Sequence, residues 1–262
     1  MSQKTVRRAA GFSALVVIAV LFGAPGAHAG EWKWEIAPYA WISDVGVDVS
    51  LNETDIGGTT IDFKDILDKA DLGALVHFEG RKGRGGLFVD VVYLSLSDDQ
   101  TTSGASPIPD GTIVDVELDQ LIGEVGGFYR FTGDERGLDL LFGARVMDVS
   151  LDANFDFPDT SLLADRSRSS DKTLLDGFVG LRFGQDISDR WLWSIRGDVG
   201  AGDTDLTWQG VLIFGVQFGK NRDKTLYFGY RHLAYEAEEG NMGITEREIE
   251  FSGPEVGFGF SF

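Results

Sequence analysis

Apolar and polar residues alternate with a period of two along most of this chain, and this pattern constrains the fold more than any other feature. In 174–185, for example, Leu175 and Val179 share one face of an extended segment, and Asp176 and Arg182 share the other. Successive side chains of a β-strand point to opposite faces, so the pattern predicts strands rather than helices. We expect ten strands, at residues 31–43, 72–81, 87–97, 114–131, 138–151, 173–184, 191–201, 207–219, 225–236 and 248–262.

The connections between these segments alternate between short and long. Four are short turns, and five are mostly longer and more polar. An up-and-down antiparallel β-barrel with tight turns at one rim and long loops at the other has this rhythm. We therefore predict an all-β transmembrane barrel of about ten strands, with eight or twelve possible. The short turns are 82–86, 132–137, 185–190 and 220–224, and the long connections are 44–71, 98–113, 152–172, 202–206 and 237–247.

The N-terminal segment has the pattern of a secretory signal peptide. Lys4, Arg7 and Arg8 precede an apolar run at 12–22, and Ala27-His28-Ala29 forms a small-residue cleavage site. The run is short for a membrane anchor, which is the alternative interpretation. We predict that residues 1–29 are removed and that residues 30–262 form one barrel domain beyond the inner membrane.

Alternation alone does not separate a soluble β-sandwich from a membrane barrel, but the placement of aromatic residues favours the barrel. Aromatic side chains form girdles at both membrane interfaces of outer-membrane barrels. A soluble sandwich gives no reason to sort aromatic residues by strand end. The expected girdle comprises Trp32, Trp34, Tyr129, Phe131, Phe183, Trp191, Trp193 and Phe218 at the short-turn rim, with Trp41, Tyr93 and Trp208 toward the other rim.

The C-terminal segment carries the most specific resemblance. Val256, Phe258, Phe260 and Phe262 alternate with small residues. This resembles the C-terminal strand that the barrel-assembly machinery recognises in bacterial outer-membrane proteins. Segments 77–97 and 126–131 also resemble an uncharacterised porin-like or OmpA-like group of outer-membrane β-barrel domains. The resemblance implies a barrel in the bacterial outer membrane, among its lipid and lipopolysaccharide, with both termini in the periplasm.

On the predicted strand phases, a nearly balanced set of charges faces the interior. An unpaired charge is costly in a narrow interior, so near-balance suggests ion pairs. These pairs either hold a small barrel closed or line a polar conduit. Every base is an arginine, whose planar fork suits paired carboxylates. The set is Glu79, Arg81, Asp90, Glu124, Arg130, Asp139, Arg145, Asp176, Arg182, Arg196, Asp198, Arg231 and Glu255.

Net charge concentrates at the rim with the long connections. After residue 29 the chain holds 20 basic and 42 acidic residues, a net charge of −22. Segments 44–71, 98–119, 148–172, 202–206 and 236–250 together hold 28 acidic and six basic residues. This acidity argues against nucleic-acid binding. It fits a solvated outer mouth, or loops that bind divalent cations or a partner.

No motif in the sequence indicates catalysis or a cofactor. After residue 29 the histidines are His77 and His232, and neither belongs to a recognisable Ser-His-carboxylate pattern. The chain contains no cysteine and no nucleotide-binding fingerprint. We therefore expect no enzyme, no cofactor and no assigned metal site. Two functions remain open: a narrow passive channel for small cationic or zwitterionic solutes, and a non-conducting structural or surface-binding barrel.

Overall fold

The structure, a computed structural model, describes residues 32–51, 54–61, 64, 70–101, 112–133, 135–157, 166–237 and 244–262, and almost all of them lie in β-strands. The expected signal peptide lies outside the described residues. No helix in the described part of the chain is long and apolar enough to cross a membrane. The strands are β1 (Lys33–Trp41), β2 (Asp44–Leu51), β3 (Thr54–Ile61), β4 (Ala70–Lys82), β5 (Gly85–Thr101), β6 (Ile113–Arg130), β7 (Leu138–Asp156), β8 (Arg166–Asp186), β9 (Trp191–Gly202), β10 (Leu206–Phe218), β11 (Lys224–Ala237) and β12 (Ile244–Ser261).

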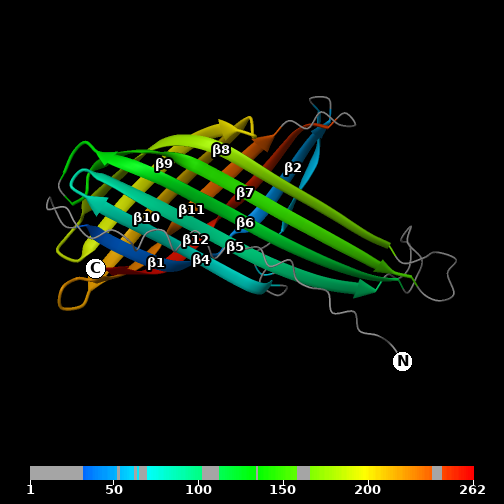
Figure 1. The fold of residues 1–262 in the computed structure, drawn as a ribbon, viewed down its shortest axis with the longest axis horizontal. Helices are drawn as coiled ribbons and strands as arrows, with labels where there is room; N and C mark the ends of the chain where they lie inside the picture. The colour runs from blue at the N-terminus through cyan, green and yellow to red at the C-terminus, as the bar shows by residue number, and fades with distance from the viewer. Residues whose placement is uncertain are drawn as a thin grey trace. The chain divides into compact units, whose positions relative to one another are not determined.

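Ten of these strands close into an antiparallel barrel (Figure 1). From β4 to β12 each strand pairs with the next along the chain. β1 pairs with β4 on one side and with β12 on the other, where Glu35 lies opposite Ser261. The predicted all-β, up-and-down antiparallel barrel is confirmed.

The segment 44–71, expected as a connection, instead contains strands β2 and β3. β1 ends at Trp41, and the backbone N–H of Ile42 still donates to the carbonyl of Pro254 at 2.8 Å. β2 then follows the same edge of β12, starting with Asp44 opposite Ser252. β12 is twice as long as β1, so β1 pairs with only part of its edge. β2 pairs with the remaining part and satisfies its backbone hydrogen-bonding groups. Apolar and polar residues alternate in segment 44–71 too, but its polar positions are acidic, as is typical of a solvated loop.

The outward face of the barrel wall is apolar and exposed. Val125 is 59% exposed and Leu175 is 55% exposed, although both lie in the middle of long strands. The same strands bury charged residues such as Arg145 on their other face. Water would disfavour this arrangement, whereas lipid favours it. Other large outward residues with high exposure are Phe142, Val179, Leu181, Ile195, Val199, Leu226, Phe228, Tyr230 and Val256.

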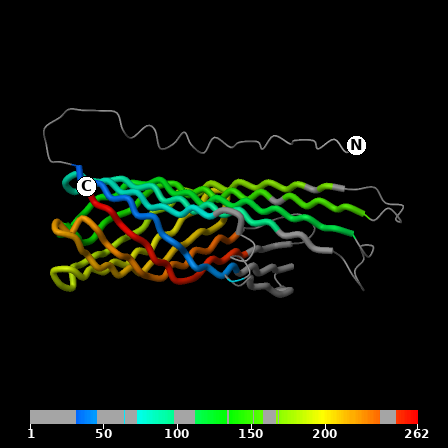
Figure 2. Tube along the Cα trace, turned by 90° about the horizontal axis from the view of Figure 1, so that it is seen from below, coloured from blue at the N-terminus to red at the C-terminus, as the bar shows by residue number. Residues whose placement is uncertain are grey.

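Strands β5–β8 continue past their neighbours and form a four-stranded extension at the long-connection rim (Figure 2). β4 pairs with β5 only as far as Leu96, and β9 pairs with β8 only as far as Asp176. The β6–β7 pair continues to Ile113 opposite Asp156. On the outward face of this extension, acidic residues replace the apolar residues of the wall below. The extension therefore belongs to the aqueous side of the interface.

Candidate functional site: a layered barrel interior

A network of three arginines and two carboxylates crosses the middle of the interior. Arg145 donates from Nε to Glu124 at 2.9 Å and from Nη2 to Asp198 at 2.5 Å. Arg196 bridges the same two carboxylates at 2.8 and 2.7 Å. Arg231 reaches Glu124 at 3.4 Å. The side chains of Arg145, Glu124 and Asp198 have no exposed surface, so the middle of the interior holds fully desolvated charges.

Asp90 extends this network toward β1 and β4. It accepts a hydrogen bond from Arg231 Nη1 at 3.0 Å and another from the Tyr39 hydroxyl at 2.8 Å. His77 Nδ1 lies 3.1 Å from the same carboxylate, and His77 Nε2 lies 3.8 Å from Glu79. Asp90 is therefore held from three strands, which ties β5 across the interior to β11.

A second group of ion pairs lies nearer the short-turn rim. Arg182 binds Glu79 with two hydrogen bonds, of 2.5 and 3.2 Å, and binds Asp139 at 2.9 Å. Arg130 donates hydrogen bonds to the same Asp139 from two nitrogens, at 2.6 and 2.9 Å. These fork-like pairs fix the β4 and β8 walls to each other.

Aromatic side chains support the arginines from inside the wall. The Arg145 guanidinium lies 5.1 Å from the ring centroid of Phe178, and the Arg182 guanidinium lies 4.7 Å from that of Phe128. Arg196 lies over both Phe88 and Phe178. The sequence analysis did not select these rings. Their signal was available, because each shares the strand phase of a predicted inward charge.

Ten of the thirteen predicted interior charges form the ion pairs given above. Asp176 accepts hydrogen bonds from the backbone N–H and the hydroxyl of Thr204, which fixes the tight β9–β10 turn. Arg81 donates to the carbonyl of Gly83 near the short-turn rim. Glu255 faces the interior without a hydrogen bond to any described side chain. The ten are Glu79, Asp90, Glu124, Arg130, Asp139, Arg145, Arg182, Arg196, Asp198 and Arg231.

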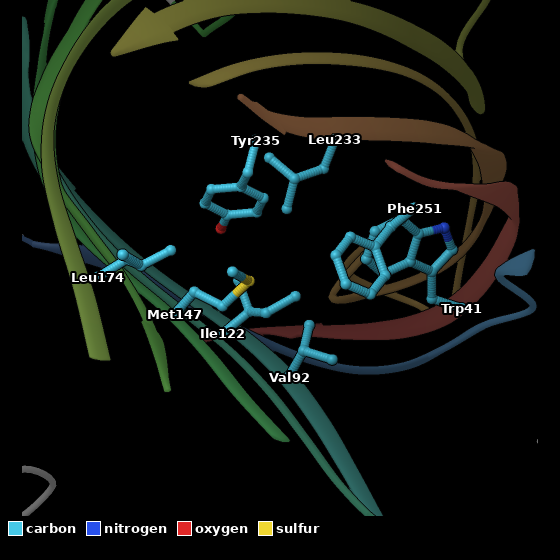
Figure 3. Close-up of a cluster of buried hydrophobic side chains, with 8 residues drawn as sticks. All are labelled: Trp41, Val92, Ile122, Met147, Leu174, Leu233, Tyr235 and Phe251. Atoms are coloured by element: carbon cyan, nitrogen blue, oxygen red, sulfur yellow. The ribbon is translucent and has the colours of Figure 1, made fainter. Parts of the chain in front are cut away.

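An apolar cluster lies inside the barrel on the long-connection side of the central network (Figure 3). Leu233 has no exposed surface, and Ile122, Met147 and Tyr235 are at most 3% exposed. The sequence analysis did not predict an apolar layer inside the barrel. We call this cluster the apolar layer; its members are Trp41, Val92, Ile122, Met147, Leu174, Leu233, Tyr235 and Phe251.

Trp41 was expected in the aromatic girdle, and this expectation is wrong. The residue is 7% exposed, and its indole Nε1 donates to the carbonyl of Gly253 at 3.3 Å. The Arg231 guanidinium lies 4.8 Å from its ring centroid. Trp41 shares the inward phase of Ala37 and Tyr39, and its polar N–H finds a partner inside.

The other predicted girdle residues lie on the outward phase. Trp32 stacks on Trp34 with 4.9 Å between ring centroids, and the Tyr93 hydroxyl donates to Asp119. Their contact with a membrane interface stays a prediction. Seven are exposed by at least a third: Trp32, Tyr129, Phe131, Phe183, Trp191, Trp208 and Phe218.

The four residues of the predicted assembly signal also face outward. Val256, Phe260 and Phe262 are exposed. Phe258 packs edge-on against Phe218 at 5.2 Å. The residues between them, Gly257 and Gly259, point inward and are buried. Recognition by assembly machinery stays a prediction.

A cavity of about 840 Å³ lies between the short turns and the central network. Turn residues Ser188 and Asn221 line its outer part, and Arg231 and Glu255 line its inner part. Glycines make room along β12, because a Cβ on Gly259 would lie 2.6 Å from the Tyr227 ring. The Gly-aromatic alternation of the C-terminal strand therefore also shapes this space.

Neither histidine is arranged for nucleophilic catalysis in the described part of the chain. His77 is held by Asp90 and Glu79, and His232 packs on Trp208 at the outer face with 4.3 Å between ring centroids. Among the described residues, no group of three or more histidines and carboxylates could enclose a metal ion.

A closed hydrogen-bonded wall, an exposed apolar outward band and a charged interior together define the environment of this chain. Every strand of the barrel satisfies its backbone within the sheet, as lipid requires. The chain has the fold of a transmembrane β-barrel.

Comparison with known proteins identifies structures with a similar fold but no family. No protein-family model matches the chain, and no curated protein matches it. Solved structures of other barrels align with 88–90% of this chain at low identity, so the likeness concerns the fold alone. They include the outer membrane protease OmpT from Escherichia coli (10% identity, 96% of that chain, TM-score 0.44), Ail of Yersinia pestis (11%, 99%, 0.38) and OprG from Pseudomonas aeruginosa (11%, 98%, 0.30).

Proposed function

We propose that this protein is a non-conducting outer-membrane barrel that presents an acidic, cation-binding face at the cell surface. The observation that carries the proposal is that two successive layers of buried side chains occupy the interior. The central ion-pair network has no exposed surface at Arg145, Glu124 or Asp198. The apolar layer lies directly beyond it.

Each layer opposes a different part of ion passage. A hydrated ion would shed water in the apolar layer, whose described polar groups, the Tyr235 hydroxyl and the Trp41 indole N–H, replace little of that hydration. It would then need to separate paired charges in the network, which leaves buried charges uncompensated. The narrow-channel alternative requires both layers to rearrange.

Planar-bilayer recording tests whether the barrel conducts. The full-length mature barrel, with its folded fraction measured by heat-dependent electrophoretic mobility, should give no discrete conductance steps. Cation-selective steps from the folded protein would contradict the proposal and favour the channel.

The acidic face of the proposal is the outward surface of the β5–β8 extension. Glu117 on β6 lies directly opposite Asp152 on β7. Asp115 and Asp119 lie on the same face of β6. Like charges directly opposite in a sheet are destabilising, and a bound cation would relieve that repulsion. Because no three described carboxylates could enclose an ion, the remaining oxygen ligands would come from outside. Phosphate groups of neighbouring lipopolysaccharide supply such oxygens.

Thermal unfolding with and without divalent cation tests the acidic face. Millimolar Ca²⁺ or Mg²⁺ should raise the midpoint of the folded barrel, and more so in lipopolysaccharide-containing vesicles. The double variant Glu117→Gln, Asp152→Asn should lose most of this cation-dependent increase. Asp189→Asn, in the exposed β8–β9 turn, is the matched control and should keep it. An equal cation response in all three proteins would rule out this face as the binding surface.

A further inference from the structure

The cavity beneath the central network borders that network at its inner end and faces the short-turn rim. Its inner end is formed in part by Arg196, Arg231 and Gln209, all of which bind the carboxylates of the central network. Its volume of about 840 Å³ lies within the ~300–1,000 Å³ typical of small-molecule sites. The cavity is therefore large enough for a small molecule and borders the central network at its inner end.

The charges that face this cavity are paired unequally. The deep arginines Arg182, Arg196 and Arg231 each hold at least two carboxylate partners. Two carboxylates facing the same space, Glu35 and Glu255, form no ion pair with any described basic residue.

These two carboxylates differ in their surroundings. Glu35 accepts hydrogen bonds from neutral donors, the Tyr227 hydroxyl at 2.7 Å and the Ser261 hydroxyl at 3.1 Å. Glu255 accepts none from the described side chains, although it is half-buried. The cavity thus has spare acceptor capacity at its inner end, where the Arg231 guanidinium lies close enough to offset part of the Glu255 charge. An ammonium donor would fill that acceptor capacity.

Part of the cavity lining near Glu255 is apolar. Leu192 of β9 and Val211 and Ile213 of β10 line it. Apolar side chains do not coordinate a metal ion, and too few oxygen ligands lie near Glu255 to complete a metal site among the described residues. An aliphatic chain would bury methylene groups against it.

We propose that this cavity binds an aliphatic amine, entering from the short-turn rim, with one ammonium group on Glu255 and its methylene chain against Val211 and Ile213. Glu35 lies opposite Ser261, six residues along β12 from Glu255, so at roughly 20 Å it is beyond the reach of the second ammonium group of a short diamine, which faces the open part of the cavity. This site is separate from the acidic outer face and does not depend on it.

Calorimetric titration of the folded full-length mature barrel with putrescine and spermidine tests the proposal. Both amines should bind, whereas 1,4-butanediol and succinate should not, because the first lacks charge and the second carries the wrong one. Glu255→Gln should weaken amine binding by about tenfold or more, as expected for one lost charge-assisted hydrogen bond. Glu255 has no described partner, so the Gln variant should fold normally.

Two further variants separate the site from general electrostatic attraction. Val211→Phe fills the cavity without altering any charge and should abolish binding. Asp156→Asn removes an exposed acid at the end of β7, outside the cavity lining, and should leave affinity within about twofold. Unchanged affinity in both Glu255→Gln and Val211→Phe would overturn the proposal, as would the absence of binding at millimolar amine. Neither result depends on bilayer conductance or on divalent cations.

Discussion

Breaking the central network at Arg145 should destabilise the barrel more than any single surface change. Arg145 donates to Glu124, Asp198 and Thr207 and is fully buried. Arg145→Met keeps most of the side-chain volume but removes the charge. Breaking a buried ion pair costs about 3–5 kcal/mol. We expect about 3 kcal/mol, at the lower end of that range, because Arg196 still serves both carboxylates.

The partner variant makes the argument quantitative. Glu124→Gln removes one carboxylate, so the three arginines of the network are left with fewer acidic partners. It should lower the free energy of unfolding by about 2 kcal/mol by the same reasoning. The double variant restores the balance of charge. Its cost should therefore fall below the sum of the two single costs by at least about 1 kcal/mol.

Denaturant unfolding in detergent micelles, followed by tryptophan fluorescence, measures these free energies. Arg190→Met, in the exposed β8–β9 turn, is the control and should stay within about 0.5 kcal/mol of wild type. Additive costs in the double variant would refute the charge-balance reasoning. A loss below about 1 kcal/mol for Arg145→Met would refute the claim that the network is desolvated.

Four further changes test other parts of the structure. Val125→Lys places a charge at an outward position that is 59% exposed, and should cost about 2 kcal/mol in lipid vesicles but much less in a protein whose outer face is hydrated. Asp176→Ala removes both hydrogen bonds to Thr204 and should cost about 1–3 kcal/mol in the same unfolding assay. The ammonium of Lys33 on β1 lowers the pKa of Glu135 in the β6–β7 turn. This pair therefore stabilises the fold at pH values above the usual glutamate pKa, and the stabilisation is lost as the pH falls. The stability difference between wild type and Lys33→Met should therefore shrink between about pH 6 and about pH 3. Phe262→Ala should lower the amount of assembled barrel in cells, measured by heat-dependent mobility of outer-membrane fractions, without changing the unfolding midpoint of the refolded protein.

Strand phase made most of this architecture accessible from the sequence. Asp90, Arg145 and Asp198 could be assigned to the interior because alternation fixes the face of every residue in a regular strand. Partners were not accessible, since which arginine meets which carboxylate depends on register and barrel shear. Arg231 and Asp90 are 141 positions apart and meet only across the closed interior.

The interpretation failed where one rule was applied to the full length of a strand. Inward residues were assumed to be polar throughout, so the inward phase of Trp41, Ile122 and Met147 was not interpreted as an apolar layer. The acidic polar face of segment 44–71 predicts a loop, although the segment alternates as a strand does. In both places the local environment changes along a strand while the period stays the same.

The sequence separations within the central network have a consequence for folding. Glu124 and Arg145 lie on adjacent strands and can pair as soon as the β6–β7 hairpin forms. Asp90 gains Arg231 only when β11 is in place, late in the sequence. Until then some interior carboxylates lack their arginine partners, and these unpaired charges destabilise a partly formed barrel. Completion of the barrel and neutralisation of its interior are thus one event, which favours all-or-none folding and slow unfolding.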